Sequence, residues 1–185
     1  MMDNLPALLS DPVIGRTLAA TLSVVFFAGA WQKLKEPTVF AAAIENYRLV
    51  PEAWAAWLAY LLPLVELAAG LLLLSPESSG LGALIALALL ATVTSAVAIN
   101  LLRGHTNIDC GCGGLSSQPL SWSLVGRNAV LMAVLLPAAG SDLDRPLVWA
   151  DYVTVGGGVL ALLGLYVAAN QLMTNAPLAL AVRNK

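Results

Sequence analysis

The chain has 185 residues, of which 59% are hydrophobic and only 11% are charged, and its mean hydropathy is +0.81. A soluble domain is about 45–50% apolar and about 25% charged, and a chain of this length cannot hide so much apolar surface in its own interior. Its net charge of −2 excludes the basic surface of a nucleic-acid-binding protein, and its two cysteines exclude a disulfide-rich secreted domain. The composition therefore predicts a small integral membrane protein embedded in a lipid bilayer.

Long stretches with few or no charges indicate the membrane-spanning helices, because a spanning helix needs about 20 mostly apolar residues. Five segments are predicted to span: 13–32, 53–74, 81–102, 124–140 and 152–173. All five tryptophans fall at or just outside the ends of these segments, at the headgroup level that indole prefers. The first eleven residues hold acidic but no basic residues, so the first helix is expected to be retained and not cleaved as a signal peptide. The sequence thus predicts an all-α membrane bundle that forms one domain over residues 1–185.

Between the first two spans, residues 37–50 form a predicted amphipathic helix that lies in the membrane interface. Phe40, Ile44 and Tyr47 recur at helical spacing, and Pro51 ends the pattern. A connecting role for this helix is favoured over a role as a lid on the bundle.

The last span contains two pairs of small residues at a spacing of four, Gly157/Ala161 and Gly164/Ala168. Such pairs let helix backbones approach closely in lipid. Packing within the bundle is the favoured use, with homodimerisation as the alternative.

The predicted loop at 103–122 holds both cysteines and the only histidine of the chain. Cys110 and Cys112 are separated by Gly111, which tolerates the backbone angles of a tight turn. Such a turn brings two residues at this spacing within the range of about 4.4–6.8 Å between Cα atoms that a disulfide requires. A disulfide that closes so small a ring is expected to be strained. A strained disulfide is easily reduced and suits exchange more than structural cross-linking. The pattern predicts a redox pair.

Neighbouring residues suggest two kinds of chemistry for this loop. Arg103 and His105 are candidates for stabilising a cysteine thiolate, which is the reactive form. A metal site is the alternative, with four candidate ligands: His105, Asp109, Cys110 and Cys112. Structural zinc sites usually use cysteine pairs spaced by two to four residues together with a second pair, which this chain lacks, so no metal is expected.

Glu66 is a carboxylate well inside the second predicted span. An ionised acid at the centre of a bilayer costs about 2.5 kcal/mol or more and marks a candidate site. The residue serves either as a structural bridge between helices or as a functional group that relays protons or holds a quinone or substrate head group. Its candidate bridging partners are Lys33, Asn100 and Arg127.

Two groups of residues resemble a known family. The first resembles the shared core of DoxX-type membrane proteins: Gly29, Lys33, Leu34, Pro37, Phe40, Tyr47, Pro51, the run Leu62-Pro63-Leu64-Val65-Glu66-Leu67, and Gly70. The second is similar to the methylamine utilisation protein MauE branch of that group: Asn100-Leu101-Leu102-Arg103-Gly104 and Asp109-Cys110-Gly111-Cys112. The resemblance covers most of the chain, from Ile14 to Met173.

The resemblance implies a four-helix DoxX-like core with a fifth, C-terminal transmembrane helix, located in the bacterial inner (cytoplasmic) membrane. It implies a protein that supports processing, export or disulfide maturation of the methylamine dehydrogenase small subunit beside a thioredoxin-like partner. An analogy with four-helix membrane thiol oxidoreductases that pass electrons to quinones makes a quinone the candidate cofactor. That analogy concerns the fold, and function must be argued from the site.

Cys110 and Cys112 are therefore expected to exchange disulfides with a soluble thioredoxin-like protein, with Glu66, Lys33 and Asn100 lining the bundle interior beneath the loop. This makes the chain a candidate membrane thiol-disulfide oxidoreductase. The alternative is a non-enzymatic assembly or transport factor whose cysteine loop senses redox state or binds metal.

The distribution of basic residues and the expected disulfide chemistry predict opposite orientations of the chain in the membrane. Arg16 and Arg145 lie on the N-terminal side, and seven basic residues lie on the side of the cysteine loop: Lys33, Lys35, Arg48, Arg103, Arg127, Arg183 and Lys185. The positive-inside rule puts the loop in the cytoplasm. The rarity of stable cytosolic disulfides and the periplasmic client implied by the resemblance put it on the opposite face, so the sequence leaves the face open.

Overall fold

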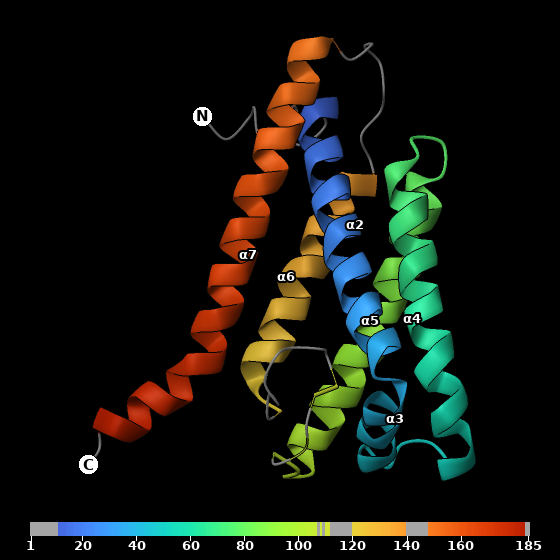
Figure 1. Ribbon diagram of the computed structural model, residues 1–185, viewed down its shortest axis with the longest axis vertical. Coiled ribbons are helices and arrows are strands. Elements are labelled where there is room, and N and C mark those ends of the chain that lie inside the picture. Colours follow the sequence, from blue (N-terminus) through green and yellow to red (C-terminus); the bar gives the residue numbers. More distant parts are fainter. Residues whose placement is uncertain (1–10, 107, 109, 112–119, 140–147, 184–185) are drawn as a thin grey trace.

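The computed structural model describes residues 11–106, 108, 110–111, 120–139 and 148–183. All regular structure in these residues is helical, which confirms the predicted all-α fold (Figure 1). The elements are α2 (Pro12–Lys35), α3 (Pro37–Asn46), α4 (Glu52–Leu74), α5 (Ser79–Leu102), α6 (Trp122–Ala139) and α7 (Trp149–Arg183).

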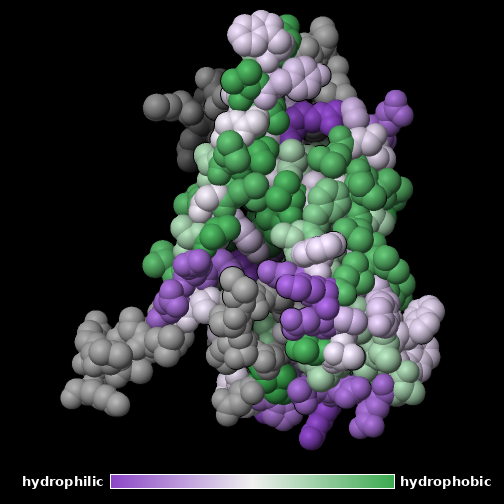
Figure 2. All heavy atoms as spheres, viewed as in Figure 1, coloured by the Kyte–Doolittle hydropathy of each residue, from purple (hydrophilic) through white to green (hydrophobic). Residues whose placement is uncertain are grey.

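Five of these helices, all except α3, are long and apolar enough to cross a membrane. The five tryptophans of the chain are all exposed, as side chains in a headgroup layer are. Figure 2 shows hydrophobic residues concentrated across the middle of the visible face, with hydrophilic residues near its upper end and a larger number of them toward its lower end. These features are those of a helical membrane bundle, with outer surfaces that suit lipid.

The ends of α2 follow from local sequence. The carboxylate of Asp11 accepts a hydrogen bond from the backbone N–H of Val13 at 2.8 Å, and Pro12 occupies the first helical position. An aspartate cap satisfies one of the unpaired N–H groups of the first turn, and proline is favoured at the first helical position because its fixed φ suits the helix. At the other end, Pro37 follows directly after Glu36 and begins α3.

Four helices form the bundle: α2 packs against α4 and α6, and α5 packs against α4 and α6. Small residues bring the backbones together at two points. The hydroxyl of Ser23 in α2 donates to the carbonyl of Gly70 in α4 at 2.9 Å, and a Cβ on Gly82 in α5 would lie 2.6 Å from the backbone nitrogen of Leu73 in α4. The main apolar core consists of alanines, leucines and one phenylalanine from these four helices.

Helix α3 packs against α4 at the end of the bundle where α2 and α5 end and α6 begins (Figure 1). It ends at Asn46, four residues before the predicted end at residue 50. The physical reason is the backbone of Arg48, whose φ of +49° is incompatible with a continuing right-handed helix. Arg48 therefore lies in a tight turn between α3 and α4.

Helix α7 packs along α2 and diverges from the other helices toward its C-terminal end (Figure 1). It reaches Arg183, ten residues past the predicted end of the span at 173. Its close approach to α2 is at Gly158, where a Cβ would lie 2.7 Å from the methyl group of Thr17, whereas Gly157 and Gly164 face open space. The small-residue pairs predicted to pack within the bundle are therefore not the ones that contact α2.

Two glycines in the first turn of α5 provide a matched test of the α4–α5 contact. We expect Gly82→Ala to destabilise the bundle by about 1–3 kcal/mol, because the added methyl group meets rigid backbone atoms. Gly80→Ala meets nothing within 4 Å and is expected to be neutral or slightly stabilising, since alanine favours a helix by about 1 kcal/mol over glycine. Unfolding of the purified variants in detergent micelles measures both effects, and equal stability of the two variants would contradict this packing.

Candidate functional site

The cysteine loop is anchored to the bundle through the backbone of Cys110. The hydroxyl of Tyr47 donates a hydrogen bond to the carbonyl oxygen of Cys110 at 3.1 Å. Cys110 is 6% exposed and carries no free thiol, and it packs in an apolar cluster with Tyr47, Val97, Leu120 and Leu124. The side chain of Cys110 thus lies in an apolar layer contributed by the helix ends around it.

Two further bonds tie the described parts of the loop to each other and to α5. The backbone N–H of Leu120 donates to the carbonyl of Ile108 at 3.1 Å, which joins residues on either side of the two cysteines. The backbone N–H of His105 donates to the carbonyl of Asn100 at 3.0 Å. Asp109 and Cys112, both predicted site residues, lie outside the described residues.

Gly111 follows Cys110 in a left-handed backbone conformation with φ of +64°, which strains any residue with a Cβ. The space beside it is also filled. A Cβ at this position would lie 3.0 Å from the methyl group of Ala43 and 3.2 Å from the ring of Phe40, both on α3. Both the backbone angle and the contact with α3 therefore require glycine between the two cysteines.

Phe40 connects this turn with a buried ion pair. The ammonium group of Lys33 lies 5.6 Å from the centroid of the Phe40 ring, within the range of a cation–π interaction. Lys33 also forms an ion pair with Oε1 of Glu66, and the two side chains are only 11% and 9% exposed. Gly111, Phe40, Lys33 and Glu66 therefore form a continuous series of contacts from the cysteine loop into the bundle.

The carboxylate of Glu66 is only partly satisfied. Its Oε1 contacts Lys33, whereas Oε2 is buried and has no hydrogen-bond partner among the described residues. Gly29, one turn before Lys33, lies beside both groups, since a Cβ there would be 3.7 Å from Oε2. Of the three bridging partners predicted for Glu66, the structure places Lys33 against it.

The other two candidate partners bond elsewhere. Asn100 is fully buried; its amide nitrogen donates to the carbonyl of Ala96 at 3.1 Å, and its Oδ1 lies 3.3 Å from Nδ1 of His105. Because Oδ1 can only accept, Nδ1 of His105 is the donor in this arrangement. Asn100 therefore holds the start of the loop and does not contact Glu66.

Arg127 belongs to a second polar cluster, between α5, α6 and α7. Its guanidinium donates to Oδ1 of Asn170 in α7 at 3.0 Å and to Oδ1 of Asn128 at 3.4 Å, and the amide of Asn128 donates to Thr94 in α5 at 3.0 Å. Hydrogen bonds of this kind hold transmembrane helices together. Arg103, in contrast, is exposed at the end of α5.

Sequence reasoning missed the residues that hold the loop. The sequence predicts Phe40 and Tyr47 on the apolar face of an interfacial helix, and no signal in it links either of them to the cysteines. A buried tyrosine usually finds a partner for its hydroxyl, which was the one available clue for Tyr47. Its partner, the Cys110 carbonyl, is 63 residues away along the chain and could not be read from spacing.

These observations define the class of protein: a multi-pass helical membrane protein with a cysteine-containing loop held at one end of the bundle. The chain belongs to the Methylamine utilisation protein MauE family, whose sequence model matches residues 11–140. That segment contains α2 to α6, the cysteine loop and the Lys33–Glu66 pair, whereas α7 with Asn170 lies outside it.

Curated relatives agree with this assignment. The chain is 40% identical over 133 residues to the methylamine utilization protein MauE of Paracoccus denitrificans, covering 71% of each chain. It is 39% identical over 169 residues to that of Paracoccus versutus, covering 89% of each chain. The similar protein of Methylorubrum extorquens is 40% identical over 141 residues, covering 72% of this chain and 75% of the relative. No solved structure matches the chain.

The two left-handed glycines of the loop give a matched test of its packing on α3. Gly104 (φ +79°) has open space where a Cβ would lie, whereas Gly111 is packed against Phe40 and Ala43. We expect Gly104→Ala to cost about 1–2 kcal/mol through backbone strain alone, and Gly111→Ala to cost more. Unfolding in detergent micelles measures both, and a Gly111→Ala cost no larger than that of Gly104→Ala would contradict the contact with α3.

The buried ion pair predicts strongly coupled substitutions. We expect Glu66→Leu to destabilise the protein by about 3 kcal/mol or more, because it leaves the Lys33 ammonium buried without a partner. Lys33→Met alone is expected to have a comparable cost. The double variant should recover most of the lost stability, because it leaves no buried charge without a partner and places two apolar side chains in contact. A double-mutant cycle measured by unfolding in lipid bicelles gives the coupling energy, and a value near zero would contradict the pairing.

Proposed function

We propose that this protein catalyses thiol–disulfide exchange at the membrane surface through Cys110 and Cys112, in support of methylamine utilisation. The name of its family and of its curated relatives supports the second part of this proposal. The left-handed turn at Gly111 carries the first part, because a residue in that conformation between two cysteines lets them approach each other. Cys110 has no free thiol, and Cys112 is the other cysteine of the chain.

The burial of Cys110 supports different roles for the two sulfurs. Cys110 is 6% exposed and packs among apolar side chains, so a partner protein cannot reach its sulfur. We therefore assign Cys112 as the sulfur that exchanges with the partner and Cys110 as the resolving cysteine. Tyr47 and Phe40 act as positioning residues, since they hold the backbone of Cys110 and Gly111.

The exchange proceeds in two displacements. A thiolate of the partner attacks Sγ of Cys112, the disulfide between Cys112 and Cys110 breaks, and its electron pair passes to Sγ of Cys110, which takes up a proton. A second thiolate of the partner then attacks the partner's own sulfur in the mixed disulfide and releases Cys112. Two electrons have then moved from the partner dithiol to the Cys110–Cys112 pair, and a disulfide of a thioredoxin-like protein restores the oxidised pair by the reverse steps.

A quinone is not assigned to this site. The structure has a hollow near the cysteine loop, lined largely by polar residues, and a second, more apolar hollow that includes Arg16, Leu74 and Tyr152 at the opposite end of the bundle. Neither combines an apolar lining with nearness to Cys110. No step of the exchange is therefore routed through a quinone, which stays a prediction from the family resemblance.

For the client, we propose the small subunit of methylamine dehydrogenase, as the family resemblance implies, with the protein in the bacterial inner membrane. A periplasmic client requires the cysteine loop on the periplasmic face. Two of the seven basic residues counted on that side are neutralised or bonded inside the bundle, Lys33 by Glu66 and Arg127 by asparagines, which leaves five against two. The charge argument for a cytoplasmic loop is thereby weakened.

Removing one cysteine at a time tests this mechanism. We expect Cys110→Ser to accumulate a mixed disulfide between Cys112 and the oxidised thioredoxin-like protein, because the Cys112 thiolate attacks the disulfide of that protein and the resolving thiol is missing. Cys112→Ser should accumulate none. Non-reducing electrophoresis of membranes followed by mass spectrometry identifies the adduct. Normal growth on methylamine of the strain with both cysteines replaced by serine would overturn the exchange function.

The proposed periplasmic client requires the cysteine loop on the periplasmic face of the membrane, and labelling of the cysteines tests this location. In intact cells, a membrane-impermeant maleimide is expected to label the wild-type protein only after prior reduction. Labelling that needs a permeant maleimide places the loop in the cytoplasm and rules out a periplasmic client. Labelling without reduction under all growth conditions contradicts the disulfide cycle itself.

A further inference from the structure

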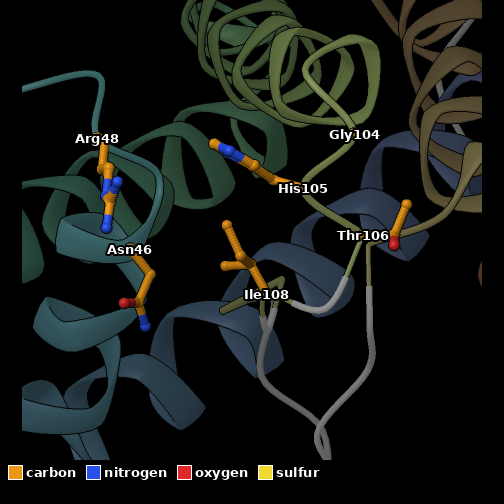
Figure 3. Close-up of a pocket in the computed structure, with 6 residues that line it drawn as sticks. All are labelled: Asn46, Arg48, Gly104, His105, Thr106 and Ile108. Atoms are coloured by element: carbon orange, nitrogen blue, oxygen red, sulfur yellow. The ribbon is translucent and has the colours of Figure 1, made fainter.

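A hollow of about 330 Å³ lies beside the cysteine loop. It is lined by Asn46, Arg48, Gly104, His105, Thr106 and Ile108 (Figure 3). Asn46 and Arg48 come from the turn after α3, and the other four come from the chain after α5. Figure 3 shows the side chains of Arg48 and His105 pointing toward the space between these two walls, with Ile108 below them.

Both walls of this hollow are attached to Cys110. On one side, Tyr47 stands between Asn46 and Arg48 and donates its hydroxyl to the Cys110 carbonyl. On the other side, Ile108 is two residues before Cys110 and packs on the same apolar cluster. A group bound in the hollow is thus held beside the proposed redox pair.

The lining offers hydrogen-bond donors without partners. The guanidinium of Arg48, the amide of Asn46 and the hydroxyl of Thr106 make no side-chain hydrogen bond to any described residue, and none of the described residues that line the hollow is acidic. The Nδ1 atom of His105 is occupied by Asn100, which fixes the ring, so the donors that this lining offers come from the other three side chains. A guanidinium fork together with neutral donors matches a carboxylate, which accepts two parallel hydrogen bonds from arginine.

One side chain that faces the hollow from the turn after α3 belongs to a residue with a strained backbone, Arg48. Its φ of +49° is the one positive value for a non-glycine residue in the part of the chain described. Strained backbone angles of this kind cluster at binding and catalytic sites, where the surrounding structure holds them in place. Here the anchored Tyr47 fixes the preceding residue, so the tether of the cysteine loop also sets the position of Arg48.

We propose that this hollow binds a carboxylate side chain of the partner protein, in the segment that carries the exchanging cysteine. The inference rests on the proposed thiol–disulfide exchange and adds a specificity determinant to it. Exchange brings a polypeptide chain to this loop, and the hollow shares both walls with the anchor of Cys110. Its volume, at the small end of ligand pockets, and its polar lining suit one acidic side chain.

Cysteine peptides that differ in one residue test this proposal. One peptide carries aspartate near its cysteine and the matched peptide carries asparagine, with the spacing varied from one to four residues. The oxidised full-length protein in neutral-lipid nanodiscs is mixed with each peptide, and the rate of mixed-disulfide formation is measured. Each rate is divided by the rate of the same peptide with an unrelated small disulfide, which removes the effect of aspartate on the peptide thiol itself.

We expect the aspartate peptide to react about fivefold faster than the asparagine peptide at low ionic strength, as an ion pair of about 1 kcal/mol gives, and the preference to shrink in high salt. Arg48→Asn should abolish the preference while tolerating the left-handed backbone, and Arg48→Lys should keep part of it. Lys35→Asn is the matched control: it removes one exposed positive charge at the same end of the bundle and should keep the full preference.

The outcomes separate this inference from the function on which it rests. Equal rates for the two peptides, or a preference that persists in Arg48→Asn, overturn the carboxylate site alone. Failure of every peptide to form a mixed disulfide overturns the exchange function and this inference together. Equal peptide rates combined with an Arg48-dependent retention of anionic lipid in native mass spectrometry assign the hollow to a lipid headgroup instead and overturn the proposal.

Discussion

One buried ion pair determines how the helices and the cysteine loop are arranged. Lys33 and Glu66 are nearly excluded from solvent in helices that cross the membrane, where an unpaired charge costs several kcal/mol. The two residues can meet only if α2 and α4 adopt one rotation and one axial position relative to each other. Gly29, one turn before Lys33, lies beside both groups.

The end of the bundle is built outward from that pair. Phe40 lies over Lys33, Gly111 lies against Phe40, and Tyr47 bonds the residue before that glycine. The short helix α3 therefore contacts both the Lys33 ammonium and the loop that carries the cysteines, so the position of the loop depends on the position of Lys33. The position of the loop depends on the face of α3 beneath it, and α3 in turn packs on α4.

The sequence was sufficient for features that depend on local composition and insufficient for those that depend on contacts across the chain. Apolar length and charge placement predicted five spanning helices, because lipid imposes that pattern on every span. The cost of burying Glu66 predicted a partner, and only the fold selected Lys33 from three candidates. The bond from Tyr47 to Cys110 and the strained turn at Arg48 arise from tertiary packing, which no periodicity encodes.

The placement of α7 has a consequence for assembly in the membrane. The other four spans contact one another and enclose the ion pair, whereas α7 lies along the outer side of α2 and bonds to α6 through Arg127 and Asn170. Helices in a membrane insert first and associate afterwards, and the chain emerges with its N-terminus first. The first four spans can therefore associate and bury the Lys33–Glu66 pair before α7 joins them, and Arg127 gains its bond to Asn170 only when α7 arrives.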